Sequence, residues 1–221
     1  MKKPVVDYRE FRLSRLNEPR FSHLKLLLGW VVYFIFYFLT ENLIPLERHH
    51  LIHSRLDDLI PFNEYFVIFY VSWYVLIVFC LIVFALYDIK SFKNLSKYIM
   101  VTQAVAMAIY ILWPSIQDLR PAEFARDNIL TRLMGFIYAF DTPTGVCPSL
   151  HVAYTMGICS VWLKKKDAPL WWKFVLVIWG VLICISTAFV KQHSTYDILA
   201  AIPLGILAEI LVFHGFLKEK E

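Results

Sequence analysis

His193 and Asp197 form the first pair in this sequence that could carry out chemistry. They are four positions apart, so in a helix the carboxylate lies one turn from the imidazole and can accept its N–H. A histidine held this way keeps its other ring nitrogen free to attack an electrophile, and the carboxylate stabilises the positive charge that develops on the ring. His151 offers a second imidazole, which can protonate a leaving oxygen and later take a proton from water. The three residues predict nucleophilic catalysis.

Groups that bind anions accompany these residues and indicate phosphorus chemistry. Arg120 and Lys191 are cations, and Ser149 stands at the start of an apolar run, where a hydroxyl and free backbone N–H groups can bind an anion. We expect these groups to hold the oxygens of a phosphoryl group. A covalent phosphohistidine route needs no metal and no other cofactor, and the same segments hold no cluster of carboxylates suited to magnesium.

The composition predicts that helices embedded in a membrane position these residues. The chain has 221 residues, of which 59% are hydrophobic and only 18% charged, which is too much apolar surface for one soluble core. We expect an all-α polytopic membrane protein with six transmembrane helices in a bundle, since each span needs roughly 20 residues. The predicted spans are 24–44, 65–87, 98–116, 150–163, 174–190 and 196–217. The fourth is short for a layer about 30 Å thick, so its first turn should lie in a recess below the membrane surface.

The loops predict the orientation of this bundle. Lysine and arginine gather before the first span, between the second and third, between the fourth and fifth, and after the sixth, which places those segments in the cytoplasm by the positive-inside rule. The net charge of +4 is modest and clustered in these loops, which favours membrane orientation over nucleic-acid binding. Residues 129–140 have helical apolar spacing and predict a short interfacial helix between spans three and four.

We therefore divide the chain into three parts. Residues 1–23 are a basic cytoplasmic segment, residues 24–217 a single six-helix transmembrane domain, and residues 218–221 a cytoplasmic tail. The candidate residues fall on the opposite, extracytoplasmic face. A compact chain with no organelle-targeting segment favours the cytoplasmic membrane of a bacterium.

Three segments resemble the signature motifs of the phosphatidic acid phosphatase type 2 superfamily of membrane lipid phosphatases and phosphotransferases. Those motifs read KxxxxxxRP, PSGH and SRxxxxxHxxxD, and residues 113–121, 148–151 and 186–197 keep their spacing. The resemblance implies that His193 becomes phosphorylated, that Asp197 supports it and that His151 protonates the leaving group. The expected phosphate-binding positions, from the motifs and from Lys191 beside them, are Arg120, Ser149, Leu150, Lys191 and Ser186.

This sequence departs from the motifs at three positions. Trp113 replaces the lysine of the first motif, Leu150 the glycine of the second and Thr187 the arginine of the third. Two cations are therefore missing, and Lys191, two residues before His193, is a candidate to restore one charge.

The Pro-Ser-Leu-His form of the second motif is similar to the branch that contains inositol phosphorylceramide synthases, which pass a phosphoryl headgroup to an alcohol. Three functions stay open: a lipid phosphatase, a lipid phosphotransferase, and a catalytically silent lipid-binding or transport protein.

The expected partner is a lipid phosphate that enters sideways from the bilayer. Phosphatidic acid, phosphatidylglycerol phosphate and polyprenyl diphosphates all fit. His49, His50 and His53 form a weak metal-site pattern, and we interpret them as part of an interfacial helix. Glu209 lies about 18 Å deeper than Asp197 at helical rise, so we expect it to serve packing within the bundle or to lie near the cytoplasmic surface.

Overall fold

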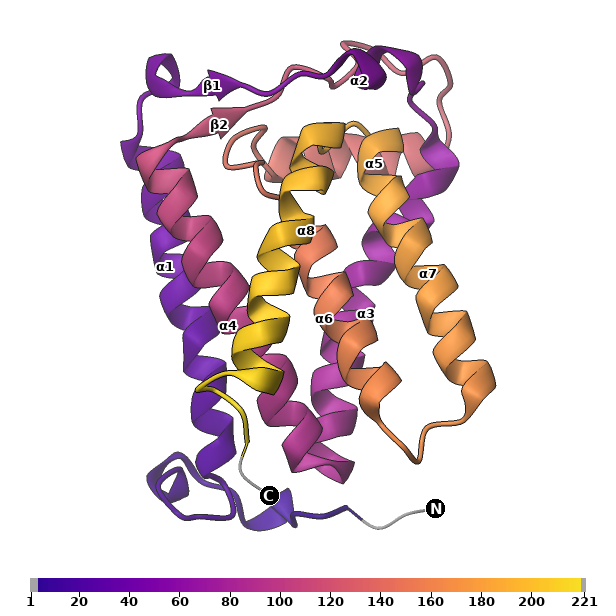
Figure 1. Ribbon diagram of the computed structural model, residues 1–221. Coiled ribbons are helices and arrows are strands. Elements are labelled where there is room, and N and C mark those ends of the chain that lie inside the picture. The colour runs from indigo at the N-terminus through magenta and orange to yellow at the C-terminus, as the bar shows by residue number, and fades with distance from the viewer. Residues whose placement is uncertain (1–3, 220–221) are drawn as a thin grey trace.

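The structure is a computed structural model that describes residues 4–219, and it is built almost entirely of helices (Figure 1). Lys2, Lys3 and Lys220, which belong to the basic clusters at the two ends of the chain, lie outside the described residues. The helices are α1 (Leu28–Leu43), α2 (Arg55–Leu59), α3 (Val67–Tyr87), α4 (Ile89–Leu112), α5 (Ile129–Phe140), α6 (Leu150–Lys164), α7 (Leu170–Phe189) and α8 (Thr195–Glu209). A π-helical turn, Ile210–His214, extends α8, and short 3-10 helices cover Tyr8–Glu10, Leu13–Arg15, Ser22–Leu27, Leu46–Arg48 and Glu64–Phe66. Two short strands, β1 (His50–Leu51) and β2 (Ser115–Ile116), pair in parallel.

Five helical segments of the described chain are long and apolar enough to cross a membrane. They are Ser22–Leu43, Glu64–Tyr87, Ile89–Leu112, Leu170–Phe189 and Thr195–His214. The prediction of a helical protein with membrane-spanning helices is therefore confirmed at this level. The fourth predicted span is α6, which has 15 residues and reaches only about 22 Å at helical rise, less than the roughly 30 Å of a hydrocarbon layer. The count of six spans stays a prediction.

The third span differs most from its predicted bounds. The helix α4 begins at Ile89 instead of residue 98, because Asp88 caps its first turn by accepting the Ser91 N–H at 3.0 Å. The lysines that the sequence placed in a loop therefore lie on the helix. At the other end α4 stops at Leu112, since a residue that precedes a proline, here Trp113 before Pro114, is disfavoured in helical conformation.

The predicted helix over His49–His53 is wrong, because this segment is mainly extended. The N–H groups of His50 and Ile52 donate to the carbonyls of Pro114 and Ile116 at 2.8 Å, and this pairing joins β1 to β2. Beyond the strand, His53 lies between two carboxylates, with Nδ1 3.2 Å from Asp118 and Nε2 2.9 Å from Asp58. Hydrogen bonds to Asp118 and Asp58 raise the pKa of His53.

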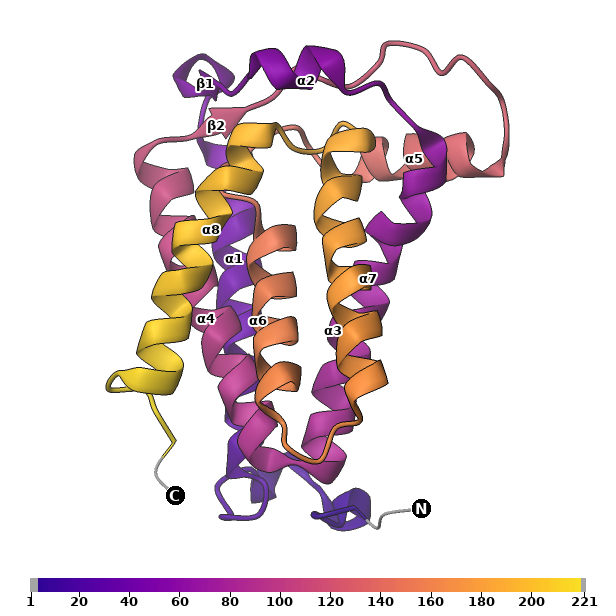
Figure 2. The same ribbon diagram turned by 45° about the vertical axis from the view of Figure 1, so that its right-hand side comes forward.

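The two ends of the bundle are built differently (Figures 1 and 2). One end, which we call the cap end, carries β1, β2, α2 and α5, and α5 lies across the ends of the long helices. The opposite end, the terminal end, holds both ends of the described chain: the Val5 N–H donates to the Leu86 carbonyl at 2.7 Å, and Lys97 Nζ donates to the Leu217 carbonyl at 2.9 Å. The helix predicted at 129–140 is α5, with the same bounds; its location at a membrane interface stays a prediction.

The centre of the bundle is formed where α4, α6 and α8 approach one another closely. Gly157 of α6 packs directly on Tyr98 of α4, so a Cβ at position 157 would lie 2.5 Å from Tyr98 Cδ1. The Tyr98 hydroxyl in turn donates to the Gly205 carbonyl of α8 at 2.8 Å. Small residues at such crossings let helix backbones approach, as membrane helix bundles require. Facing outward instead, α1 exposes Val31, Phe34, Ile35, Phe38 and Leu39.

Candidate active site

The loop between α7 and α8 carries His193 at the cap end. Lys191 ends the α7 turn with a left-handed backbone, φ 53°, and the Thr187 carbonyl accepts the N–H groups of Gln192 and His193 at 3.0 and 3.1 Å. The next helix starts at once, with Ser194 as its N-cap. The backbone on both sides of His193 is therefore fixed by helix ends.

Asp197 makes the predicted contact with His193. Its Oδ2 lies 3.3 Å from His193 Nδ1 and accepts the Ser194 N–H at 2.9 Å. The capping box of α8 thus uses the same carboxylate oxygen that faces the imidazole. An acceptor at Nδ1 places the ring proton there and leaves the lone pair on Nε2. The lone pair of His193 is therefore on Nε2, the ring nitrogen that does not face Asp197.

His151 lies beside His193, in the first turn of α6. Their ring centroids are 5.6 Å apart, with the planes at 64°. The His151 ring also stacks on two aromatic rings of α3, Trp73 at 4.0 Å and Tyr70 at 4.5 Å. Its Nε2 is buried and has no hydrogen-bond partner. Stacking rather than hydrogen bonding therefore fixes the plane of this ring, and its Nε2 is left without a partner.

Ser149 connects the start of α6 to the start of α8. The Ser149 N–H donates to the Asp197 carbonyl at 3.1 Å, whereas its side-chain hydroxyl is buried without a partner and does not cap α6. Figure 2 shows that α6 begins below the upper ends of α7 and α8. The Ser149 hydroxyl is therefore a buried donor without a partner among the described residues.

Arg120 reaches the site through Gln192. Its Nη2 donates to Gln192 Oε1 at 2.6 Å, its Nη1 to the carbonyls of Tyr138 and Asp141, and its guanidinium stacks on the Tyr138 ring. Only Nε is buried without a partner. Burial lowers the pKa of Arg120, although guanidinium stays charged in proteins. Its Nη donors therefore bind the end of α5 and Gln192 of the His193 loop.

Asp141 completes a chain of hydrogen bonds at the edge of the site. The Tyr37 hydroxyl of α1 donates to its Oδ1 at 3.1 Å, and Gln192 Nε2 donates to its Oδ2 at 3.3 Å. Burial raises the pKa of Asp141, and this outweighs the opposing effects of the Tyr37 hydrogen bond and the charge of Arg120. The chain from Tyr37 to Arg120 fixes the residue next to His193.

Three other predicted phosphate-binding residues face away from the two imidazoles. Lys191 Nζ donates to the Asp57 carbonyl of α2 at 2.7 Å, and burial lowers its pKa. The Ser186 hydroxyl donates to the Ile183 carbonyl of its own helix at 2.6 Å. The Leu150 side chain is buried in the hydrophobic core. Phosphate contacts by these residues stay predictions.

The residues that replace the motif cations also have other neighbours. Trp113 is 44% exposed at the end of α4 and stacks on His50, with ring centroids 4.8 Å apart and planes at 15°. Thr187 is buried in α7, where its hydroxyl donates to the Cys184 carbonyl at 2.8 Å. Neither position supplies a charge near His193.

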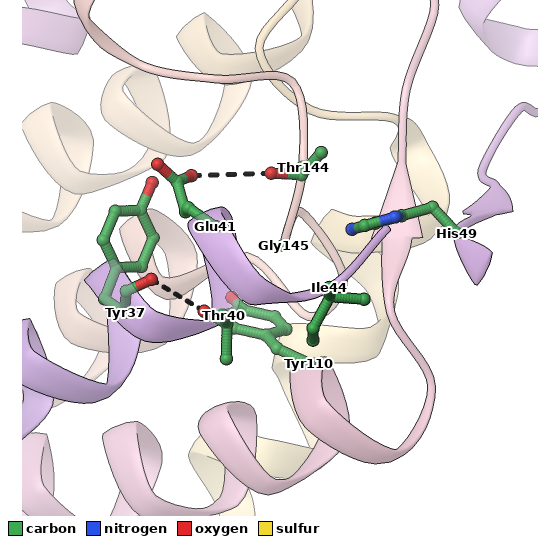
Figure 3. A pocket seen from close by; sticks show the side chains of 8 residues that line it. All are labelled: Tyr37, Thr40, Glu41, Ile44, His49, Tyr110, Thr144 and Gly145. Atoms are coloured by element: carbon green, nitrogen blue, oxygen red, sulfur yellow. Dashed lines mark hydrogen bonds between the residues drawn. The ribbon is translucent and has the colours of Figure 1, made fainter. Parts of the chain in front are cut away.

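A small pocket lies behind Tyr37, between α1, the end of α4 and the loop before α6 (Figure 3). Glu41 points toward Thr144 across it, with 3.5 Å between the carboxylate and the hydroxyl. Its volume of about 10 Å³ is close to the minimum for one water molecule. A pocket of this size cannot hold a lipid headgroup.

The candidate site contains residues that the sequence reasoning missed. Gln192 and Asp141 join Arg120 to the His193 loop, and Trp73 and Tyr70 hold the plane of His151. A helical spacing of three places Trp73 and Tyr70 on one face of their span, and this signal was readable in the sequence. No pattern identified Asp141, because its neighbours Tyr37 and Gln192 are distant along the chain.

Comparison with known proteins adds no relative. No family model, no curated protein and no solved structure matches the chain. The likeness to a phosphatase superfamily therefore rests on the three motif-like segments and their spacing.

Proposed function

We propose that the protein is a membrane lipid phosphatase that acts through a phosphohistidine intermediate. The observation that carries this proposal is the pairing of His193 with Asp197 at 3.3 Å, beside a second imidazole whose ring centre lies 5.6 Å away. A nucleophile, its orienting carboxylate and a proton donor are the three parts that covalent phosphoryl transfer needs. The unpartnered Ser149 hydroxyl and Arg120 Nε supply donors for phosphoryl oxygens.

The reaction has two steps. In the first, His193 Nε2 forms a bond to phosphorus, the bond to the leaving oxygen breaks, and protonated His151 gives that oxygen its proton. In the second, His151 takes a proton from water as the water oxygen bonds to phosphorus. The phosphorus–nitrogen bond then breaks, its electron pair returns to His193, and inorganic phosphate leaves. Asp197 stabilises the positive charge on the His193 ring while phosphorus is attached.

The second candidate function is a lipid phosphotransferase, which uses the same first step and an alcohol in place of water. The scarcity of free cations favours it: Lys191 Nζ is bound to a carbonyl, and Arg120 uses its Nη groups on the protein. A phosphomonoester carries a charge of about −1.5 to −2 at pH 7, whereas a phosphodiester carries one negative charge and needs fewer cations. A headgroup diester as donor therefore fits this site.

The proposed setting is a six-span protein with its termini in the cytoplasm, so that the site faces the extracytoplasmic leaflet. The basic loops support this orientation, because Lys93 and Lys97 contact the end of the chain and Lys165 binds Asp88 beside them. Positive charge therefore gathers at the terminal end, opposite His193. In this proposal, a lipid whose tails stay in the bilayer reaches His193 sideways.

The experiment is a release assay with the purified full chain in detergent. Phosphatidic acid, phosphatidylglycerol phosphate and undecaprenyl diphosphate are each supplied with and without an alcohol acceptor, and a phosphodiester lipid is added as a headgroup donor. Free phosphate that disappears in His193→Gln supports the phosphatase. A product formed only with the alcohol supports the transferase, and no reaction in any mixture supports a silent lipid-binding protein.

A further inference from the structure

The short helix α2 presents one buried carboxylate to the site. Of its five residues, Arg55, Leu56, Asp58 and Leu59 are exposed, and only Asp57 is buried. The helix lies at the cap end, over the loop between α7 and α8 (Figures 1 and 2). The sequence analysis gave Asp57 no role at His193.

Asp57 contacts the loop on both sides of His193. After the histidine, its Oδ2 accepts the Ser194 hydroxyl at 2.5 Å and its Oδ1 accepts the Thr195 N–H at 2.8 Å. Before it, the Asp57 carbonyl accepts Lys191 Nζ at 2.7 Å. Residues 191 and 194–195 are thus tied to one residue of α2, and the nucleophile lies between the two attachments.

The contacts continue from Asp57 to the imidazole without a break. The Ser194 hydroxyl donates to the Asp57 carboxylate, and the Ser194 backbone N–H donates to Asp197 Oδ2, the oxygen that faces His193 Nδ1. We infer that Asp57 is a positioning residue, which sets the direction of the His193 lone pair by holding Ser194 and the first turn of α8. This inference rests on the proposed function of His193.

The chemistry at position 57 requires a carboxylate. All three groups that reach its side chain are donors: the Ser54 N–H at 2.8 Å, the Ser194 hydroxyl and the Thr195 N–H. An asparagine has one acceptor oxygen, so its NH₂ group would face at least one of these donors. It would also lack the negative charge that favours the positive end of α8. Asp57→Asn should therefore shift Ser194 with little change in side-chain volume.

The test compares Asp57→Asn with Asp58→Asn in the full-length protein. Asp58 is the neighbouring residue, and its side chain is 63% exposed, so its replacement removes the same charge from the same helix without touching the His193 loop. We expect kcat on the lipid that the wild type hydrolyses to fall about 10- to 100-fold in Asp57→Asn, the range that a misplaced reacting group produces, with KM nearly unchanged. Asp58→Asn should keep the wild-type kcat.

Inhibition by vanadate separates positioning from a loss of folded protein. Vanadate takes the trigonal-bipyramidal shape of phosphoryl transfer, so a displaced His193 should raise its inhibition constant about 10-fold or more. A smaller folded fraction would lower the maximal rate and leave that constant unchanged, which would overturn the inference.

If Asp57→Asn does not fold, Ser194→Gly is the second variant, because glycine at an N-cap costs only a few tenths of a kcal/mol and removes the hydroxyl that Asp57 holds. It should give the same loss of kcat and of vanadate affinity.

Two further outcomes keep this inference separate from the proposed function. An active wild type with equal kcat and vanadate inhibition in Asp57→Asn and Asp58→Asn would overturn the role of Asp57 alone. A wild type that neither hydrolyses nor transfers any lipid phosphate would overturn both proposals.

Discussion

Replacement of Asp197 by asparagine tests the proposed catalytic pair most sharply. Asparagine keeps an oxygen that can accept the Ser194 N–H, which Asp197 now binds at 2.9 Å, so the start of α8 should survive. The substitution removes the charge that faces the His193 ring at 3.3 Å. At an effective dielectric constant of about 20, two unit charges at that distance attract by about 5 kcal/mol.

This energy sets the expected effect on the rate. A loss of about 5 kcal/mol of stabilisation in the transition state slows the reaction between 10³- and 10⁴-fold, since each 1.36 kcal/mol is a factor of ten. The retained hydrogen bond reduces the loss, so we expect kcat to fall about 10³-fold while KM changes little. The assay is release of phosphate from the preferred lipid. Asp127→Asn is the control, because Asp127 is an exposed partner of Arg132 far from α8 along the chain. More than a tenth of the wild-type kcat in folded Asp197→Asn would refute the reasoning.

Three further predictions concern the fold and its cap. Gly157→Ala places a Cβ 2.5 Å from the Tyr98 ring, whereas at Gly135 the nearest atom to an added Cβ is 3.6 Å away. We expect Gly157→Ala to lower the free energy of unfolding by about 1–3 kcal/mol and Gly135→Ala to leave the thermal midpoint nearly unchanged. Equal midpoints in the two variants would contradict the close contact of Gly157 with Tyr98. Lys191 has φ 53°, so Lys191→Gly should be more stable than Lys191→Ala by about 1 kcal/mol. Thermal unfolding in detergent can measure this difference, and the reverse order of stability would disprove the prediction. His53 has a raised pKa because its two neighbouring carboxylates favour the charged ring. Charged His53 therefore stabilises the fold below its unfolded pKa of about 6.5, and this contribution is lost as the pH rises through its higher folded pKa. The thermal midpoint should drop more between pH 6 and pH 8 in the wild type than in His53→Gln. Equal drops would refute this prediction.

The sequence predicted those parts of the fold that depend on local composition. Long apolar runs identified the five helices that can span a membrane, because such runs are rare in soluble proteins. The spacing within 129–140 predicted α5 with its observed bounds. The start of α4 was missed because Lys90, Lys93 and Lys97 suggested a loop, although lysines are good helix formers near the end of a span.

In the candidate site too, a contact between residues close in the sequence was predictable, and contacts between distant segments were not. The four-residue spacing predicted the contact between His193 and Asp197, although His193 lies in the loop just before the N-cap of α8 and the capping box places Asp197 beside it. The neighbours of Lys191 and Arg120 were not predictable, because they depend on how α2 and the loop before α6 fold over the bundle. The pairing of β1 with β2 also joins segments about 65 residues apart, and no local pattern marks such a contact.

Detection of phosphate on His193 tests the central claim most directly. The protein is mixed with the ³²P-labelled lipid that it turns over, quenched within milliseconds in alkali, where phosphohistidine is stable, and digested for mass spectrometry. We predict a phosphorylated peptide that contains His193, absent from His193→Gln, which forms and decays at rates that account for turnover. Turnover that continues in His193→Gln, or a wild-type reaction in which no phosphate reaches this histidine, would contradict the account.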